Sequence, residues 1–277
     1  MARLAYLGPP GTFTEEAALR YCADAQLLHF ATEAAVASAV ESGMAEEGVL
    51  PIENSLEGSV TSTLDVLIHE SKLVVRAEII LPVEHCLIAR PGMTAEDVQV
   101  IYSKPQALSQ CRKFIERCFP NAAQEAALST TAAVKQMLEV PGGAAIGAAR
   151  AAELYGAEVL ARGVQDTPHN KTRFAVLGRE DGAPTGRDKT SIAFSVAHDQ
   201  PGTLVEVLHE FADRSINLTK IESRPSREEL GTYIFLVDME GHRSEATVAA
   251  ALAGVEAKAF FLRVLGSYPR WDDARNP

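Results

Sequence analysis

Short apolar runs alternate with helical segments along the first 179 residues, and this alternation constrains the fold more than any other feature. The runs that predict strands are Arg3–Leu7, Glu47–Ile52, Lys72–Leu81, Glu84–Ala89, Val98–Tyr102, Ala144–Gly147 and Arg173–Leu177. The segments that predict helices are Glu15–Tyr21, Ala31–Glu41, Gln106–Cys118, Ser129–Leu138 and Ala148–Tyr155. Strands that alternate with helices of about 10 to 15 residues are typical of βαβ units. The sequence therefore predicts an α/β body with a mainly parallel sheet.

A different pattern follows residues 180–188, which read EDGAPTGRD and have the polar, Gly- and Pro-containing composition of a linker. Ile192, Phe194 and Val196 alternate with smaller residues and predict a half-buried strand. The segments that complete the pattern are a helix after Pro201-Gly202, strands at Asn217–Arg224 and Thr232–Asp238, a helix capped by Ser244 and a strand at Phe260–Leu265. The order βαββαβ is the ferredoxin-like arrangement, which is compatible with many functions.

The composition of the chain says more about its function than about its fold. The chain has 277 residues, a formal net charge of −11 and a pI near 5.2, which argue against a nucleic-acid partner but leave anionic small molecules open. Its four cysteines contain no C-x-x-C pair and no metal-type spacing, so we expect reduced thiols. We find no signal peptide and no membrane-spanning run in the sequence and expect a cytoplasmic protein.

The turn between Leu7 and Glu15 reads LGPPGTFTE, a Gly-rich loop that leads into a helix. Thr12 and Glu15 have the spacing of a capping box. Free N–H groups at a helix N-terminus attract an anion, and a carboxylate fits better than a nucleotide because the spacing is not G-x-G-x-x-G. A purely structural turn is the alternative.

Two further polar segments follow predicted strands, Pro51–Ser59 (PIENSLEGS) and Ser103–Gln106 (SKPQ), and Gln110 lies one helical turn beyond Gln106. In open α/β sheets, ligands bind beyond the carboxyl ends of strands. An ordinary loop for the first segment and helix capping by Ser103 for the second are the alternatives.

Residues 166–174 read DTPHNKTRF and form the densest polar cluster of the body. In an extended chain the side chains of Asn170, Thr172 and Phe174 point one way, whereas those of Lys171 and Arg173 point the other way. Thr172 and Arg173 should therefore not contact the same atom. The sequence has no H-E-x-x-H, G-x-S-x-G or carboxylate cluster, so neither metal chemistry nor serine-hydrolase chemistry is indicated.

Taken together, the motifs resemble prephenate dehydratase. The resemblance rests on GPPGTFTEEA, PIENSLEGS, SKPQALSQC, AAELYG and DTPHNKTRFAVLGR in this order. Residues 190–268, with PGTLVEVL and INLTKIESRP, resemble the phenylalanine-binding ACT domain fused to that enzyme. The resemblance covers essentially the whole chain.

The resemblance implies a catalytic domain over 1–180, built from two α/β lobes like those of a periplasmic binding protein around a cleft. One lobe would be residues 1–80 with 172–179, and the other residues 82–166, with hinges near 81–82 and 165–168. A linker at 181–188, an ACT domain at 189–270 and a tail at 271–277 would follow.

The resemblance also implies site residues. The family's catalytic positions fall on Glu53, Asn54, Ser103, Gln110 and Thr172, and substrate-binding positions on Gly11, Thr12, Phe13, Asn170, Arg173 and Phe174. The chain departs from the family at Lys104, where a histidine is usual. The phenylalanine site would include Pro201, Gly202, Thr203, Leu204, Val205, Asn217, Leu218, Glu222, Ser223, Arg224 and Pro225.

The implied reaction converts prephenate into phenylpyruvate, carbon dioxide and water in L-phenylalanine biosynthesis, without a cofactor or metal. We expect Thr172 to donate a hydrogen bond to the departing hydroxyl, because a threonine is too weak an acid to be a general acid. The Gly-loop amides, Ser103, Asn54 and either Arg173 or Lys104 would orient the carboxylates. L-Phenylalanine would bind the ACT domains of a homo-oligomer, a dimer or tetramer, with the sign of its effect left open.

Three alternatives remain at the level of sequence. Arogenate dehydratase performs the same reaction on the aminated substrate. A non-catalytic two-lobe ligand-binding regulator would bind tightly without forming product. The C-terminal domain could be a purely structural or dimerising module.

Overall fold

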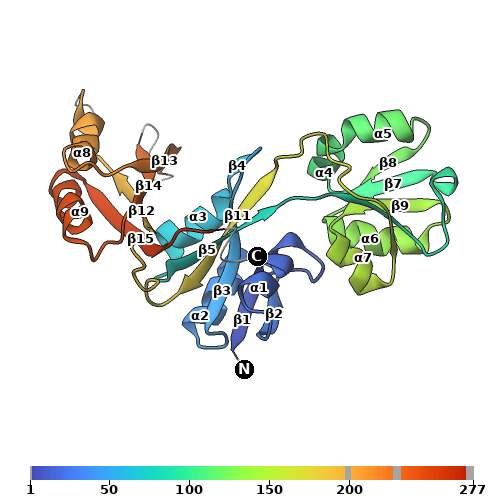
Figure 1. Ribbon diagram of the computed structural model, residues 1–277, viewed down its shortest axis with the longest axis horizontal. Helices are drawn as coiled ribbons and strands as arrows, with labels where there is room; N and C mark the ends of the chain where they lie inside the picture. The colour runs from blue at the N-terminus through green and yellow to red at the C-terminus, as the bar shows by residue number, and fades with distance from the viewer. Residues whose placement is uncertain (1, 197–200, 227–231, 273–277) are drawn as a thin grey trace. The chain divides into compact units, whose positions relative to one another are not determined.

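The computed structural model describes residues 2–196, 201–226 and 232–272 (Figure 1). Its first sheet has the order β2-β1-β3-β11-β5, with β4 paired to β3. The strands are β1 (Arg3–Leu7), β2 (Gln26–Phe30), β3 (Glu47–Asn54), β4 (Gly58–Ser59), β5 (Val74–Pro82) and β11 (Lys171–Gly178). The helices within this stretch are α1 (Phe13–Tyr21), α2 (Glu33–Glu41), α3 (Thr61–Asp65) and a π-helical turn over Val66–Glu70.

The second sheet has the order β10-β6-β9-β7-β8. Its strands are β6 (Cys86–Ala89), β7 (Val100–Ser103), β8 (Ala123–Ala126), β9 (Gly143–Gly147) and β10 (Glu158–Ala161). Strand β7 runs parallel to β8 and β9, whereas β6 runs antiparallel to β9 and β10. The expectation of a mainly parallel sheet is wrong here, because β6 enters this sheet from the connection after β5 and not through a crossover helix.

Helices cover both faces of the second sheet (Figure 1). They are α4 (Pro105–Gln110), α5 (Arg112–Cys118), α6 (Thr130–Glu139) and α7 (Ala149–Tyr155), and a 3₁₀ turn spans Ala95–Asp97. Neighbouring residues of β6 enter different cores, because successive side chains of a strand point to opposite faces. Ile88 packs with Val134 of α6, whereas Leu87 packs with Ile115 of α5.

The long helix predicted over 106–118 is interrupted at Cys111. Its backbone leaves the helical region (φ −114°, ψ 16°), and its N–H donates to the carbonyls of both Ala107 and Leu108. Gln110 is therefore the last residue of α4. Cys111 is buried and Cys118 exposed, so the two thiols do not share one helical face.

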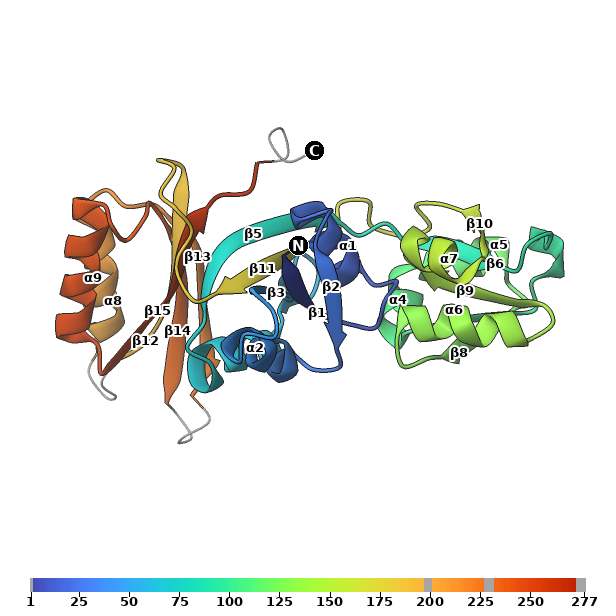
Figure 2. The same ribbon diagram turned by 90° about the horizontal axis from the view of Figure 1, so that it is seen from below.

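The third sheet has the antiparallel order β13-β14-β12-β15. Its elements are β12 (Asp188–Ser195), α8 (Thr203–Ala212), β13 (Leu218–Pro225), β14 (Tyr233–Glu240), α9 (Ala246–Lys258) and β15 (Phe261–Pro269), which confirms the predicted βαββαβ order. The two helices lie side by side on one face of the sheet (Figure 2). Helix α9 begins after Glu245 and not at Ser244, whose hydroxyl is bonded to Nδ1 of His242.

The chain divides into two compact units, one of residues 1–32, 51–60 and 80–174, the other of residues 33–50, 61–79 and 175–277. Within the second unit, the helix-free face of the third sheet lies against β5 and the π-helical turn. Lys189 pairs with Glu78, Arg224 with Asp65, and Arg263 donates to the carbonyl of Ile68. The third sheet is thus docked on β5 and the neighbouring helical segment through buried polar contacts.

Gly266 of β15 marks the closest backbone approach in this contact. It has φ +145°, and an added Cβ would lie 2.1 Å from the carbonyl oxygen of Val75. Gly266→Ala should therefore lower the free energy of unfolding by about 3 kcal/mol, measured by urea denaturation. Gly92→Ala is the matched control, since Gly92 also has a positive φ (+81°) but no described atom near its Cβ position, and it should cost about 1 kcal/mol. Equal losses in the two variants would contradict the steric explanation.

Candidate active site

A hydrogen-bonded side-chain network joins the ends of β3, α4 and β11. Its first link runs from Nδ2 of Asn54, the last residue of β3, to Oγ1 of Thr172 in β11, at 2.9 Å. This bond joins the end of β3 to the start of β11, across 118 residues of sequence.

The direction of this first link is fixed by the backbone. Oδ1 of Asn54 accepts from the N–H groups of Leu56 (2.9 Å) and Glu57 (3.3 Å). Because a backbone N–H can only donate, the Asn54 amide cannot turn over without losing both bonds. Its NH₂ group must therefore face Thr172, whose oxygen accepts. The hydroxyl proton of Thr172 therefore takes no part in this bond.

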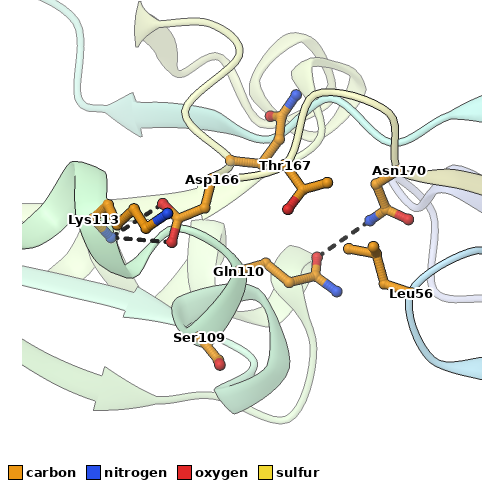
Figure 3. A pocket seen from close by; sticks show the side chains of 8 residues that line it. Leu56, Ser109, Gln110, Lys113, Asp166, Thr167 and Asn170 are labelled. Atoms are coloured by element: carbon orange, nitrogen blue, oxygen red, sulfur yellow. Dashed lines mark hydrogen bonds between the residues drawn. The ribbon is translucent and has the colours of Figure 1, made fainter.

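Asn170 continues the network and is only 2% exposed. Its Oδ1 accepts from Nδ2 of Asn54 (2.9 Å) and from the hydroxyl of Ser55 (3.3 Å). Ser55 in turn accepts from the N–H of Lys171 at 2.9 Å, which leaves the Ser55 proton for Asn170. The Nδ2 group of Asn170 is then free to donate to Oε1 of Gln110, at 3.4 Å (Figure 3).

Gln110 is the meeting point of three partners. Its Nε2 donates to the carboxylate of Glu57 at 2.9 Å, and its Oε1 also lies 2.9 Å from Nε2 of His85. Gln110 is the last residue of α4, before the break at Cys111, and its partly exposed side chain contacts three separate segments.

A polar pocket of about 220 Å³ lies beside this network (Figure 3). The residues that line it are Leu56, Ser109, Gln110, Lys113, Gln165, Asp166, Thr167 and Asn170. Lys113 gives the lining a positive charge, and its backbone N–H donates to the Asp166 carboxylate at 3.1 and 3.2 Å. The pocket therefore combines amide groups with one ammonium and one carboxylate, and the ammonium and the amides are the groups that could hold an anionic ligand.

Arg173 and Thr172 have separate partners, as the strand alternation predicts. The Nε of Arg173 lies 3.3 Å from a carboxylate oxygen of Glu53, with 12% and 32% of the two side chains exposed. Phe174 is 1% exposed and belongs to the core.

The SKPQ segment supplies less to this network than the sequence suggested. Ser103 is fully buried, and its hydroxyl donates to the carbonyl of Ile146 at 2.7 Å, a bond that ties β7 to β9. Lys104 is the exposed N-cap residue of α4, and its side chain makes no capping hydrogen bond.

The Gly-rich loop is built around Glu15. Thr12 caps α1 by accepting from the N–H of Glu15 (3.4 Å), and the Glu15 carboxylate accepts from the N–H of Gly11 (2.8 Å). The Gly11 amide that the sequence suggested for a substrate carboxylate is thus occupied by the protein's own carboxylate. Gly11 also lies against Ala151, where an added Cβ would be 3.2 Å from the Ala151 Cα. Phe13 contacts the ring of His85 edge-on, with centroids 5.9 Å apart.

The residues predicted to bind an effector lie around α8 and β13. Gly202 precedes α8 with φ +96°, and Val205 is 55% exposed. Along β13, Glu222 pairs with Lys220 at 3.2 Å, and the buried Arg224 pairs with Asp65. The other members of this set, Pro201, Thr203, Leu204, Asn217, Leu218, Ser223 and Pro225, lie in or next to the same two elements.

Within residues 2–196, 201–226 and 232–272, no group of three His, Cys, Asp or Glu side chains is arranged to hold a metal ion. In the same described part of the chain, no helix combines the length and apolarity needed to cross a membrane.

Two family models match the chain, prephenate dehydratase over residues 4–182 and the ACT domain over residues 190–257. The chain belongs to the prephenate dehydratase family. It is 42% identical to a bifunctional chorismate mutase/prephenate dehydratase of Aquifex aeolicus, over 97% of this chain and 74% of that protein. The family assigns the chain to the lyases and confirms the predicted α/β catalytic region with an ACT domain.

Two solved structures are similar over nearly the whole chain. The prephenate dehydratase of Arthrobacter aurescens in complex with L-Phe has a TM-score of 0.89 and 38% identity, covering 97% of this chain and 90% of that one. A structure described as a novel type of quorum quenching acylase has a TM-score of 0.88 and 31% identity, covering 98% and 99%.

The sequence did not point to three members of the network. Ser55 and Glu57 stand inside the PIENSLEGS motif, so their place in that loop was the available signal. His85 has no motif and no partner at regular spacing, and only the fold brings it to Gln110.

Proposed function

We propose that this chain converts prephenate into phenylpyruvate, carbon dioxide and water in the pathway to L-phenylalanine. The observation that carries the proposal is the fixed direction of the bond from Asn54 to Thr172. Since the Thr172 oxygen accepts from Asn54, its proton is available for a second acceptor, and the departing ring hydroxyl of prephenate is such an acceptor.

The reaction requires the protein mainly to position the substrate and to stabilise the developing charge. As the ring carboxylate leaves as carbon dioxide, the electron pair of its C–C bond enters the ring and expels the hydroxyl, and the ring becomes aromatic. A hydrogen bond from Thr172 stabilises the negative charge that develops on that oxygen, and a proton from the solution converts the departing hydroxide into water. The bond that Thr172 accepts from Asn54 strengthens its own donation, because hydrogen bonds in a chain polarise one another.

The two carboxylates of prephenate need cationic or N–H partners. Lys113 and the amides of Gln110 and Asn170 line the pocket beside the network and are our proposed partners. Arg173 is charge-paired with Glu53, so we propose that this pair orients the start of β11. Ser103 would act indirectly, through its bond between β7 and β9.

The direct experiment is to mix the purified chain with prephenate at neutral pH and to follow phenylpyruvate. We expect saturable formation well above the spontaneous rate, with one carbon dioxide released per product. A rate no higher than the spontaneous one would overturn the proposal. Arogenate in a parallel reaction tests the aminated substrate, and phenylalanine as the preferred product would identify an arogenate dehydratase.

An acylase activity is the rival suggested by one structural neighbour. Amide cleavage needs a nucleophile with a base that takes its proton. The described partner of Thr172 is the NH₂ group of Asn54, which donates and cannot take a proton. We therefore expect no release of fatty acid from an N-acyl homoserine lactone under the conditions of the prephenate assay, and such release without phenylpyruvate would favour the rival.

Asn54→Asp tests the direction of the Thr172 bond. Aspartate keeps the size and the bonds from Leu56 and Glu57 but can only accept, so the Thr172 proton would turn toward it and away from the substrate. We expect kcat to fall about 10²-fold in steady-state assays. Ser55→Ala is the control, because it removes a donor to Asn170 and the acceptor of the Lys171 N–H but leaves the Asn54–Thr172 bond in place, and its effect should stay within about fivefold. A near-normal kcat for Asn54→Asp would contradict the proposed direction.

For the C-terminal domain we propose L-phenylalanine binding at α8 and β13, with feedback on turnover in a cytoplasmic homo-oligomer. The ACT match and the L-Phe in the Arthrobacter structure support binding. Exposed apolar side chains of this domain, namely Val205, Ile221, Tyr233 and Phe260, support association between copies. Calorimetric titration with L-phenylalanine should show saturable heat and a change in the rate, whereas neither effect would leave a structural module. Light scattering should give a mass above that of one chain.

A further inference from the structure

His85 lies at the far end of the side-chain network from Thr172. It follows β5 along the chain and is 3% exposed. Its Nε2 lies 2.9 Å from Oε1 of Gln110, whereas its Nδ1 is buried without a hydrogen-bond partner among the described residues. The ring edge packs against Phe13. Such a buried, half-satisfied imidazole needs a physical explanation.

The network fixes which nitrogen carries the proton. The Glu57 carboxylate accepts from Gln110, so Oε1 of Gln110 faces His85 and Asn170. An amide oxygen only accepts, and therefore Nε2 of His85 must donate. Nδ1 then carries a bare lone pair, which costs less when buried than an unpaired N–H does. Burial also lowers the pKa of His85 and so favours the neutral ring, and the bond to Gln110 opposes this shift only in part.

Gln110 needs this buried donor because its other anchor is weak. Glu57 is exposed, and water competes for its bond to Gln110. If the Gln110 amide turned over, its NH₂ group would meet the NH₂ group of Asn170, and two donors would face each other. Asn170 would then have to move, and it is Asn170 that shares the NH₂ group of Asn54 with Thr172.

We propose that His85, neutral and with its proton on Nε2, is a positioning residue that holds the Gln110 amide in one orientation and thereby fixes the hydrogen-bond directions that end at Thr172. The effect on turnover rests on the proposed function, whereas the protonation of the ring does not.

The first test is nuclear magnetic resonance of protein labelled with ¹⁵N in its histidine rings at pH 7. His85→Phe identifies the His85 signals by their loss. We expect a neutral ring with the proton on Nε2 and a bare Nδ1. A proton on Nδ1 alone, or a charged ring, would overturn the proposal even if the chain converts prephenate.

The second test is a double-mutant cycle in the prephenate assay. His85→Phe keeps the ring volume but removes the donor, and kcat should fall about tenfold, the equivalent of one ordinary hydrogen bond. In a Gln110→Ala background the same change should have no further effect on kcat. The exposed His69→Phe is the matched control and should leave kcat unchanged.

A purely structural role predicts the opposite pattern. His85→Phe would then lower stability with kcat unchanged per folded molecule, or would lower kcat equally in both backgrounds, and either result overturns the proposal. If His85→Phe does not fold, His85→Met takes its place in both tests, because it also removes the donor. His85→Gln, whose amide keeps a donor, should retain most of kcat. Absence of turnover in the unmodified chain would refute the proposed function and leave the ring protonation to be decided by the first test.

Discussion

Thr172→Val should lower kcat for prephenate about 10²- to 10³-fold and change KM by less than about threefold. Valine keeps the branched shape at the start of β11 but cannot donate to the departing hydroxyl. The Asn54 amide retains its bonds to Asn170 and to the N–H groups of Leu56 and Glu57, so the loop should keep its structure. Steady-state rates of phenylpyruvate formation measure the change.

Thr172→Ser is the matched control, since it restores the hydroxyl on the same strand and should recover most of kcat. A Thr172→Val variant with a wild-type circular dichroism spectrum and near-wild-type kcat would contradict the assigned role. A rise in KM alone would show that Thr172 only binds the substrate.

Lys189→Met should lower the free energy of unfolding by about 3 kcal/mol. Lys189 and Glu78 are 8% and 6% exposed, and the ammonium lies 3.0 and 2.8 Å from the two carboxylate oxygens. Methionine fills the space of the lysine stem but leaves the Glu78 carboxylate buried without its cation. Urea denaturation measures the loss.

Lys189→Met/Glu78→Gln separates the charge from the packing. Glutamine is neutral and its oxygen can still accept from the N–H of Trp271, which donates to Glu78 at 3.0 Å. We expect the double variant to regain about half of the lost stability or more. A double variant less stable than Lys189→Met would show that the buried charge is not the cause.

The local sequence pattern was sufficient to predict elements whose apolar side chains alternate along a strand or recur at helical spacing. The strand over Asp188–Ser195 was predictable because large apolar residues alternate with smaller ones at its end, and the helix after Gly202 because its apolar residues recur at helical spacing. The strands β2, β8 and β10 were missed, since β8 is exposed throughout and β2 and β10 are short and only partly buried. The antiparallel entry of β6 into its sheet depends on tertiary contacts that no local pattern encodes.

The candidate site shows the same division between local and distant information. The resemblance pointed to Asn54, Gln110 and Thr172. Asn54 stands in a polar segment after a strand, Gln110 lies one helical turn beyond Gln106, and Thr172 stands in the polar segment that leads into β11. The directions of their hydrogen bonds could not be predicted, since they depend on contacts between residues far apart in sequence, such as Asn54 and Asn170, which are 116 residues apart. The Gly11 amide was misassigned because the sequence cannot show that the Glu15 side chain reaches back to it.

A crystal structure of Thr172→Val with bound prephenate would test the central claim most directly. The slow variant should hold intact substrate, with its ring hydroxyl next to residue 172 and its carboxylates at Lys113 and the neighbouring amides. A carboxylate of prephenate at residue 172, or a ring hydroxyl placed away from it, would contradict the account.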